Sequence, residues 1–224
     1  MPLRIEDYAV IGNCETAALV GRDGSIDWLC LPRFDSSACF CALLGRPEHG
    51  RWLIAPAQND VEITRRYLSD TLILETVFTA ANGSVSLTDF MYRRNGSSEL
   101  VRIVSGLQGE VPMRTELVVR FDFGSIVPWV SQQQDGRLQF VAGPDRVLLQ
   151  TPVPTRGEGM STVGDFTLRE GEEASFVLNW SPSFRAAPPP LSGEALAEAR
   201  KQVHSFWTGW ATAFKPAEIG RAHV

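Results

Sequence analysis

Apolar and polar side chains alternate along several short stretches of this chain, and residues 113–123 show the pattern most clearly. The same alternation returns in residues 84–88 and 176–180. A period of two residues is typical of antiparallel strands with one face buried and the other in water. The apolar face carries Met113, Leu117, Val119, Phe121 and Phe123 in the first stretch, Val85 and Leu87 in the second, and Phe176, Leu178 and Trp180 in the third.

Residues 17–31 read as two strands joined by a tight turn. Residues 17–20 are apolar, residues 21–24 (GRDG) have turn chemistry, and the alternation then resumes. Asp23-Gly24 favours a hairpin because glycine adopts a positive φ without steric cost. In the second strand, Ile26, Trp28 and Cys30 are predicted on one face and Ser25 and Asp27 on the other.

Further turn signals occur at Asn82-Gly83, Asn95-Gly96 and Asp135-Gly136. Many short strands at this spacing predict a mainly β fold, a large antiparallel β-sandwich, rather than alternating strands and helices. Residues 35–45 are the one stretch before residue 186 that reads as a helix. Asp35 or Ser36 would cap it and Gly45 would end it.

The chain changes character at three consecutive prolines, Pro188 to Pro190, which stop a strand and stiffen a linker. Ser192 is then a predicted N-cap, and Glu194 in the first turn favours the helix dipole. Apolar residues recur every three or four positions beyond it, which predicts an amphipathic linker helix of roughly five or six turns. These residues are Leu196, Ala199, Val203, Phe206 or Trp207, Trp210 and Phe214.

Composition narrows the class of protein. The hydrophobic share of 44% and the charged share of 21% are ordinary for a globular protein. A net charge of −5, with arginines scattered, argues against nucleic-acid binding. The sequence contains no run of about 20 apolar residues, so it predicts no membrane-spanning helix. The start of the chain carries acids where a signal peptide needs an apolar core, so we expect a cytoplasmic protein.

The cysteines are confined to the first fifth of the chain, at Cys14, Cys30, Cys39 and Cys41. Two disulfides or a zinc site are alternatives, but a cytoplasmic setting disfavours disulfides and the Cys39-x-Cys41 spacing does not fit common structural zinc sites. We interpret all four as buried thiols that act as small hydrophobes. His49, His204 and His223 also lack metal-ligand spacing, so we expect neither a metal nor a cofactor.

The sequence of residues 5–44 resembles the start of bacterial glycoside hydrolase family 15 proteins, the glucoamylase and trehalase-like enzymes. The resemblance continues through residues 65–67 (RRY), 74–76 (LET), 87–91 (LTDFM), 120–124 (RFDFG) and 142–145 (AGPD), and so covers almost everything before Ser183. It implies a β-sandwich domain that precedes an α-helical catalytic barrel. Residues 1–185 would be the trehalase-like N-terminal domain, and residues 186–217 the linker helix that leads into the barrel.

Residues 218–224 do not continue any pattern of the preceding sequence. The end of the chain, EIGRAHV, resembles the translation of a sequencing-library adapter. We therefore expect a truncated reading frame with a non-native tail; an ordinary disordered tail is the alternative.

The resemblance also bears on catalysis. Enzymes of this family invert configuration with two carboxylic acids, which need a separation of about 6.5–9.5 Å to admit a water molecule. In the family both acids lie on the helical barrel, so no catalytic residue is assigned in this chain. The acids inside the resembling stretches are interpreted as turn, cap or sheet-surface residues, namely Glu6, Asp7, Asp27, Asp35 and Glu75.

Two surfaces remain as candidate sites. Trp28, Arg33 and Asp35 could contact a sugar, the indole by stacking and the charged groups through hydroxyls. The alternatives are that Trp28 belongs to the core while Arg33 and Asp35 pair, or that the segment faces the catalytic barrel. The second surface is the aromatic end of the helix, with Phe206, Trp207, Trp210 and Phe214 as predicted interdomain docking residues.

These observations favour the N-terminal, non-catalytic part of an enzyme that hydrolyses α-glucosidic bonds, of glucoamylase or trehalase type. Its partner would be the catalytic barrel of the same polypeptide, with an α-glucan or trehalose as a further ligand, and neither nucleic acid nor membrane. The alternative is a free-standing carbohydrate-binding or interaction module. The wide aromatic stripe favours the first hypothesis, because a finished module should end in a polar cap.

Overall fold

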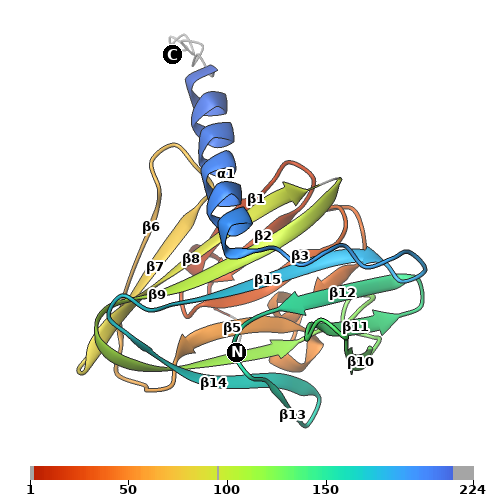
Figure 1. The fold of residues 1–224 in the computed structure, drawn as a ribbon, viewed down its shortest axis with the longest axis horizontal. Helices are drawn as coiled ribbons and strands as arrows, with labels where there is room; N and C mark the ends of the chain where they lie inside the picture. The colour runs from red at the N-terminus through yellow and green to blue at the C-terminus, as the bar shows by residue number, and fades with distance from the viewer. Residues whose placement is uncertain (1–2, 95, 214–224) are drawn as a thin grey trace, which may run out of the picture.

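The computed structural model describes residues 3–94 and 96–213, which form a β-sandwich followed by one α-helix (Figure 1). Most of the described chain is antiparallel strand, which confirms the predicted fold class. The strands are β1 (Tyr8–Gly12), β2 (Ala17–Gly21), β3 (Ser25–Cys30), β4 (Ala38–Phe40), β5 (Arg51–Pro56), β6 (Glu62–Tyr67), β7 (Leu74–Ala80), β8 (Gly83–Arg94), β9 (Ser97–Val118), β10 (Trp129–Gln132), β11 (Leu138–Ala142), β12 (Asp145–Gln150), β13 (Arg156–Glu158), β14 (Ser161–Arg169) and β15 (Glu173–Pro182). The helix is α1 (Gly193–Ala213).

Strand β9 runs through both layers of the sandwich. Its first half pairs with β8 and β15, in the layer ordered β6-β7-β8-β9-β15-β12-β11-β10. Its second half pairs with β5 and β14, in the layer ordered β1-β2-β3-β5-β9-β14-β13, with β4 beside β3. The crossing occurs near Gly106, where a Cβ would lie 2.0 Å from the carbonyl oxygen of Arg169, so only glycine fits there.

One large core fills the space between the layers, and the predicted alternation marks its strands. Met113 and Leu117 of β9 and Phe176 and Leu178 of β15 are fully buried in it. The alternation of residues 113–123 is correct as far as Val118, where β9 ends. Beyond it, Asp122 and Phe123 adopt left-handed conformations, with φ of 49° and 56°, because the chain turns sharply back to a bridge between Phe121 and Ile126.

Two details of the predicted strands are wrong. The hydroxyl face of residues 84–88 is not wet: Ser86 and Thr88 are buried, and Thr88 pairs with Ile103 on the face that the α1 cluster covers. In β3, Ile26 belongs to the large core while Trp28 and Cys30 belong to a small separate cluster. The pairing with β2 shifts there, and the extra residue of the bulge changes which side the following residues face.

The predicted helix over residues 35–45 is also wrong. The segment contains β4, paired with β3, and then a single 3₁₀ turn over Ala42–Leu44. Ala38, Cys39 and Phe40 are all buried, so strand pairing and burial on both faces prevail over the local capping signals. Other 3₁₀ turns lie at Ile5–Asp7 and Pro47–His49.

Helix α1 lies on the outer side of the layer that contains β8, β9 and β15, and its later turns extend past the strands in the view of Figure 1. Ser192 caps it as predicted: its Oγ accepts a hydrogen bond of 3.2 Å from the amide of Ala195. The linker is fixed to the sheet because the Gln150 side chain exchanges two hydrogen bonds, of 2.6 and 2.9 Å, with the backbone of Leu191.

Candidate functional site

Trp28, the first candidate sugar contact, lies half-buried near the end of β3. It packs against Cys30, Ala38 and Cys41, and its ring lies 6.3 Å from that of Phe123, at an angle of 41°. Phe123 is about half exposed and stands on the left-handed turn that follows β9. The structure therefore places two aromatic rings side by side at this end of the sandwich, where the sequence suggested only one.

Arg33 and Asp35 form an ion pair with each other on the exposed loop after β3. The Arg33 Nε donates to Asp35 Oδ1 at 3.0 Å, and Nη2 approaches Oδ2 at 3.4 Å. Both side chains are more than half exposed. Hydrogen bonding from Arg33 lowers the pKa of the Asp35 carboxyl below its usual range. The sugar contact predicted for Trp28, Arg33 and Asp35 stays a prediction.

A cleft of about 590 Å³ opens beside this loop, where three of the stretches that resemble the family come together: residues 5–44, 120–124 and 142–145. Its walls include Pro32 from the first stretch, Asp122 from the second and Asp145 from the third. Trp129 stands on the rim and is 87% exposed. Sequence reasoning missed Trp129; the available signal was a tryptophan directly after a proline, in the short apolar run of residues 126–130 (IVPWV).

The predicted docking helix divides into two parts. Leu196, Val203 and Trp207 are buried in a second cluster with Ile73, Phe90, Val101, Ile103 and Val177 of the sheet. Phe206 and Trp210 remain 52% and 58% exposed. Phe214 and residues 214–224 lie outside the described residues. Part of the aromatic stripe thus belongs to this domain's own packing, while Phe206 and Trp210 face outward.

A groove of about 400 Å³ lies along the exposed part of the helix. It is lined by Val203, Phe206 and Trp207 from α1, by residues 91–93 of β8, and by Asn13 and Cys14 of the turn between β1 and β2. The rings of Phe206 and Trp207 lie 5.1 Å apart, edge to face. Apart from Gln202, the helix residues that line the groove are apolar. The sequence did not predict the contribution of the β1–β2 turn.

The sandwich interior holds a buried ion pair that the sequence did not reveal. Arg102 of β9 and Asp89 of β8 lie directly opposite each other, with Nε and Oδ1 2.8 Å apart, and neither side chain is exposed. The same guanidinium donates to the carbonyls of Trp52 at 2.6 Å and Gly24 at 2.7 Å in the other layer. Complete burial raises the pKa of the Asp89 carboxyl, and Arg102 opposes that effect. The group joins the two layers.

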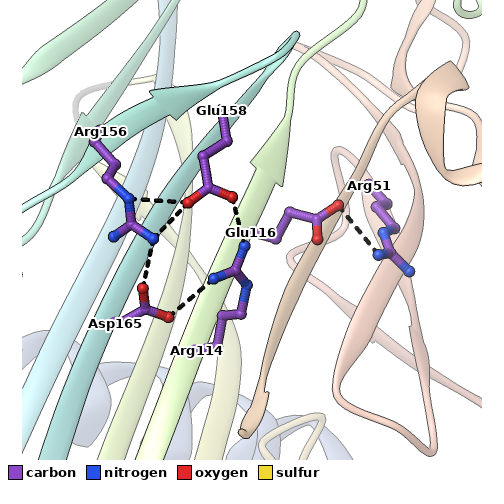
Figure 2. Close-up of polar contacts among 6 residues, drawn as sticks. All are labelled: Arg51, Arg114, Glu116, Arg156, Glu158 and Asp165. Carbon is purple, nitrogen blue, oxygen red and sulfur yellow. Dashed lines mark hydrogen bonds and ion pairs between the residues drawn. The ribbon is translucent and has the colours of Figure 1, made fainter.

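A row of charges crosses the exposed face of the opposite layer (Figure 2). Arg156 and Glu158 of β13, Asp165 of β14 and Arg114 of β9 form a closed square of ion pairs at 2.5–3.1 Å. The two guanidiniums lower the pKa of the Glu158 and Asp165 carboxyls. Next in the row, Glu116 pairs with Arg51 of β5 at 3.1 Å. The charges cancel, and they fasten the short strand β13 to its neighbours.

Three of the four cysteines are buried as predicted, at positions 30, 39 and 41, and burial raises the pKa of each thiol. The prediction is wrong for Cys14, which is exposed in the β1–β2 turn. Within residues 3–94 and 96–213, no three His, Cys, Asp or Glu side chains come together as metal ligands. No helix in the described part of the chain has the length and apolar character needed to cross a membrane.

Comparisons with known proteins agree on one family. Residues 1–156 match the family model described as "Trehalase-like, N-terminal". The chain is 29% identical to a trehalase of Thermoplasma volcanium, over 78% of this chain and 29% of the relative. It is 26% identical to a trehalase of Mycolicibacterium smegmatis, over 92% and 34%. Trehalase 1 of Sulfolobus acidocaldarius is 32% identical, over 68% and 26%. The chain thus spans about a quarter to a third of these relatives' length.

A solved structure shares the architecture. A bacterial glucoamylase complexed with acarbose superposes with a TM-score of 0.52 at 9% sequence identity, over 89% of this chain and 35% of that one. At such low identity the likeness concerns the fold alone.

Proposed function

Because the chain belongs to the trehalase-like N-terminal domain family, we propose that it serves an enzyme that hydrolyses α-glucosidic bonds, as its non-catalytic N-terminal domain. The support is the coverage: trehalases match most of this chain, while about two thirds of their own length lies outside the match. The two carboxylic acids of an inverting hydrolase would then lie in that remaining part. In this proposal, residues 1–185 form the sandwich domain and residues 186–217 lead to the catalytic barrel.

The proposed role of the domain is to dock the catalytic barrel of the same polypeptide along α1. The observation that carries it is the half-exposed aromatic surface of the helix beside an apolar groove, with Phe206 at its centre. Exposed apolar patches of this kind are typical of interaction surfaces. Leu196 and Val203 meanwhile fix the helix on the sheet, so the surface is presented on a rigid support.

Activity tests the first part of this proposal. Pure protein incubated with trehalose or maltooligosaccharides should release no more glucose than a buffer blank. Release that a point mutation in this chain abolishes would contradict a non-catalytic role.

Association tests the docking surface. The chain should self-associate in sedimentation velocity, and Phe206→Ser should reduce the association because it removes the centre of the apolar surface. The matched control is Phe184→Ser, since Phe184 is 75% exposed but lies away from the helix, in the segment after β15. A wild-type chain that stays monomeric at high concentration, or equal effects of both variants, would contradict the docking role.

A second candidate function is sugar binding at the end of β3. The observation that favours it is the Trp28–Phe123 ring pair close in sequence to the Arg33–Asp35 pair, which together offer stacking and hydroxyl contacts. The ligand would be trehalose or an α-glucan. Chemical-shift titration with trehalose and maltoheptaose tests it: Asp35→Asn should weaken binding, while Glu6→Gln in the comparably exposed Arg4–Glu6 pair should not.

The proposed location of the protein is the cytoplasm. The support is the state of the thiols: Cys14, Cys30, Cys39 and Cys41 are free, as thiols are in a reducing compartment. Fractionation of cells that express the native gene would test it, and recovery outside the cytoplasmic fraction would contradict it.

A further inference from the structure

The sandwich has an open end where β9 finishes, and a pocket of about 290 Å³ lies there between the two layers. We call it the mouth pocket. Val119 and Arg120 follow β9, Phe140 comes from β11, Val130 from β10, and Met160 from the turn between β13 and β14. Its walls are largely apolar, and the polar residues among them are Arg120, Arg156, Thr155, Ser161 and Thr162. Phe140 at its inner side is a buried core residue.

Arg120 is the buried charged group of the mouth pocket, and it is only 6% exposed. Nη1 donates to the carbonyl of Val119 at 2.7 Å, and Nη2 donates to the carbonyl of Met160 at 3.2 Å. A guanidinium has five N–H donors, so two carbonyls satisfy only part of it. Burial lowers the pKa of Arg120, and no carboxylate among the described residues offsets that effect.

The other buried arginines show how this protein normally compensates such a charge. Arg102 pairs with Asp89, and Arg137 pairs with Asp135 at 2.6 Å. Arg146 has no carboxylate partner among the described residues, but its guanidinium makes three hydrogen bonds, to Ser181 Oγ and the carbonyl of Arg185. Arg120 combines three properties: burial, partial hydrogen bonding and a position that lines a pocket.

The rim of the mouth pocket is already neutralised. Arg156 also lines the pocket, but Glu158 and Asp165 hold its guanidinium in the square shown in Figure 2. The square also anchors β13, which forms one wall. An anion that enters the pocket would therefore be drawn to Arg120 rather than to the rim.

We propose that the mouth pocket binds a small organic carboxylate, with its carboxylate group on Arg120 and its apolar body against Val130 and Phe140. A buried charge without a counter-charge is unfavourable, and a carboxylate would supply charge-assisted hydrogen bonds to the remaining donors. The volume lies just below the usual range for ligand pockets, about 300–1,000 Å³, which selects a small ligand. A sugar lacks the charge, and inorganic phosphate would leave the apolar walls unfilled.

Sodium benzoate is a suitable probe, because it carries a carboxylate on a compact apolar ring, and neutral benzamide is its matched control. Isothermal titration calorimetry of this chain should detect benzoate binding and much weaker binding of benzamide. Arg120→Met should weaken benzoate binding about tenfold or more, since a hydrogen bond to a charged group is lost. Arg156→Met at the rim should leave benzoate binding within about twofold.

The outcomes separate cleanly. Absence of benzoate binding, equal binding of benzamide, or equal losses in Arg120→Met and Arg156→Met would overturn the proposal. If Arg120→Met does not fold, Val130→Trp replaces it: the larger side chain should fill the pocket and abolish binding while Arg120 stays, and unchanged binding would overturn the proposal. The result is independent of the docking role, because it is measured on this chain alone.

Discussion

Arg102 and Arg120 are two buried arginines at different depths of the same sandwich. Arg102 sits in the middle of β9, where β8 places Asp89 directly opposite and the other layer offers two carbonyls. Arg120 follows the end of β9, where no neighbouring strand supplies a carboxylate and the pocket opens instead.

The difference shows where a sandwich can compensate a charge by itself. In the interior, strand register brings a partner from the neighbouring strand, and the ring of Trp52 lies 5.2 Å from the guanidinium carbon as an additional contact. At the mouth the strands end, so a partner has to come from a loop or from outside the domain. The following substitutions would break or sharpen this contrast.

The largest expected effect comes from Asp89→Ala. It would leave Arg102 buried without its carboxylate, the state that we assign to Arg120, but with no pocket beside it. Removal of one partner of a buried pair typically costs about 3–5 kcal/mol of stability. Urea unfolding would measure the loss, and the double variant Asp89→Leu with Arg102→Met should lose less than Asp89→Ala alone. A small loss in Asp89→Ala would mean that the interior tolerates an unpaired guanidinium after all.

Glu99 of β9 is a buried carboxylate whose partner, Arg94, is partly exposed, and its effect on stability should depend on pH. Burial raises the pKa of its carboxyl, and Arg94, at 2.6 Å, only partly offsets this. The folded state then keeps the proton to higher pH than the unfolded state, so the stability contribution is full below the ordinary pKa of about 4.3 and is lost as pH rises. The stability of wild type relative to Glu99→Gln should therefore fall from about pH 4 to pH 7.

Glu158→Gln is the matched control, because the stability contribution of Glu158 should change with pH in the opposite direction. Hydrogen bonds from Arg114 and Arg156 lower the pKa of the Glu158 carboxyl. Its contribution is present above the ordinary pKa and is lost as pH falls. Denaturant unfolding at several pH values would compare the two variants, and slopes of the same sign would contradict the assignment of burial at Glu99 and pairing at Glu158.

Arg120→Met should change stability little when no carboxylate is present, within about 1 kcal/mol in either direction. Loss of two hydrogen bonds opposes folding, while removal of an uncompensated buried charge favours it. Urea unfolding of Arg120→Met and Asp89→Ala under identical conditions would compare the two losses of stability directly. A loss as large as that of Asp89→Ala would show that the carbonyls of Val119 and Met160 fully compensate Arg120.

The smallest effect should come from the exposed square of Figure 2. Asp165→Asn removes two ion pairs, but all four side chains are at least a third exposed, so water screens their interaction. The loss in urea unfolding should be smaller than any loss seen at Asp89, and it should shrink further in about 1 M salt. A large, salt-insensitive loss would mean that the square stabilises β13 through packing rather than charge.

Local pattern was sufficient where a residue's environment follows from its neighbours in the chain. The Asp23-Gly24 turn joins β2 and β3 as predicted, and Gly24 has a φ of 84°. The spacing of Leu196, Ala199, Val203 and Trp207 correctly predicted the buried side of α1. Both features arise from short-range geometry, the positive φ of a tight turn and the 3.6-residue period of a helix.

Local pattern failed where distant strands determined the outcome. Residues 38–40 became β4 because β3 pairs with them, although their own signals favoured a helix. The bulge opposite Leu19 separated Ile26 from Trp28, which strict alternation had placed together.

The sequence by itself determined that this chain is a β-sandwich with an amphipathic helix, and its short motifs before Ser183 indicated the family. Only the tertiary structure decided that Arg102 meets Asp89, that Arg120 lines an open pocket, and that α1 keeps Phe206 exposed while it buries Trp207. Asp89 and Arg102 are thirteen residues apart, and Arg120 and Met160 are forty apart. Such contacts depend on strand register and layer packing, which alternation along the chain does not specify.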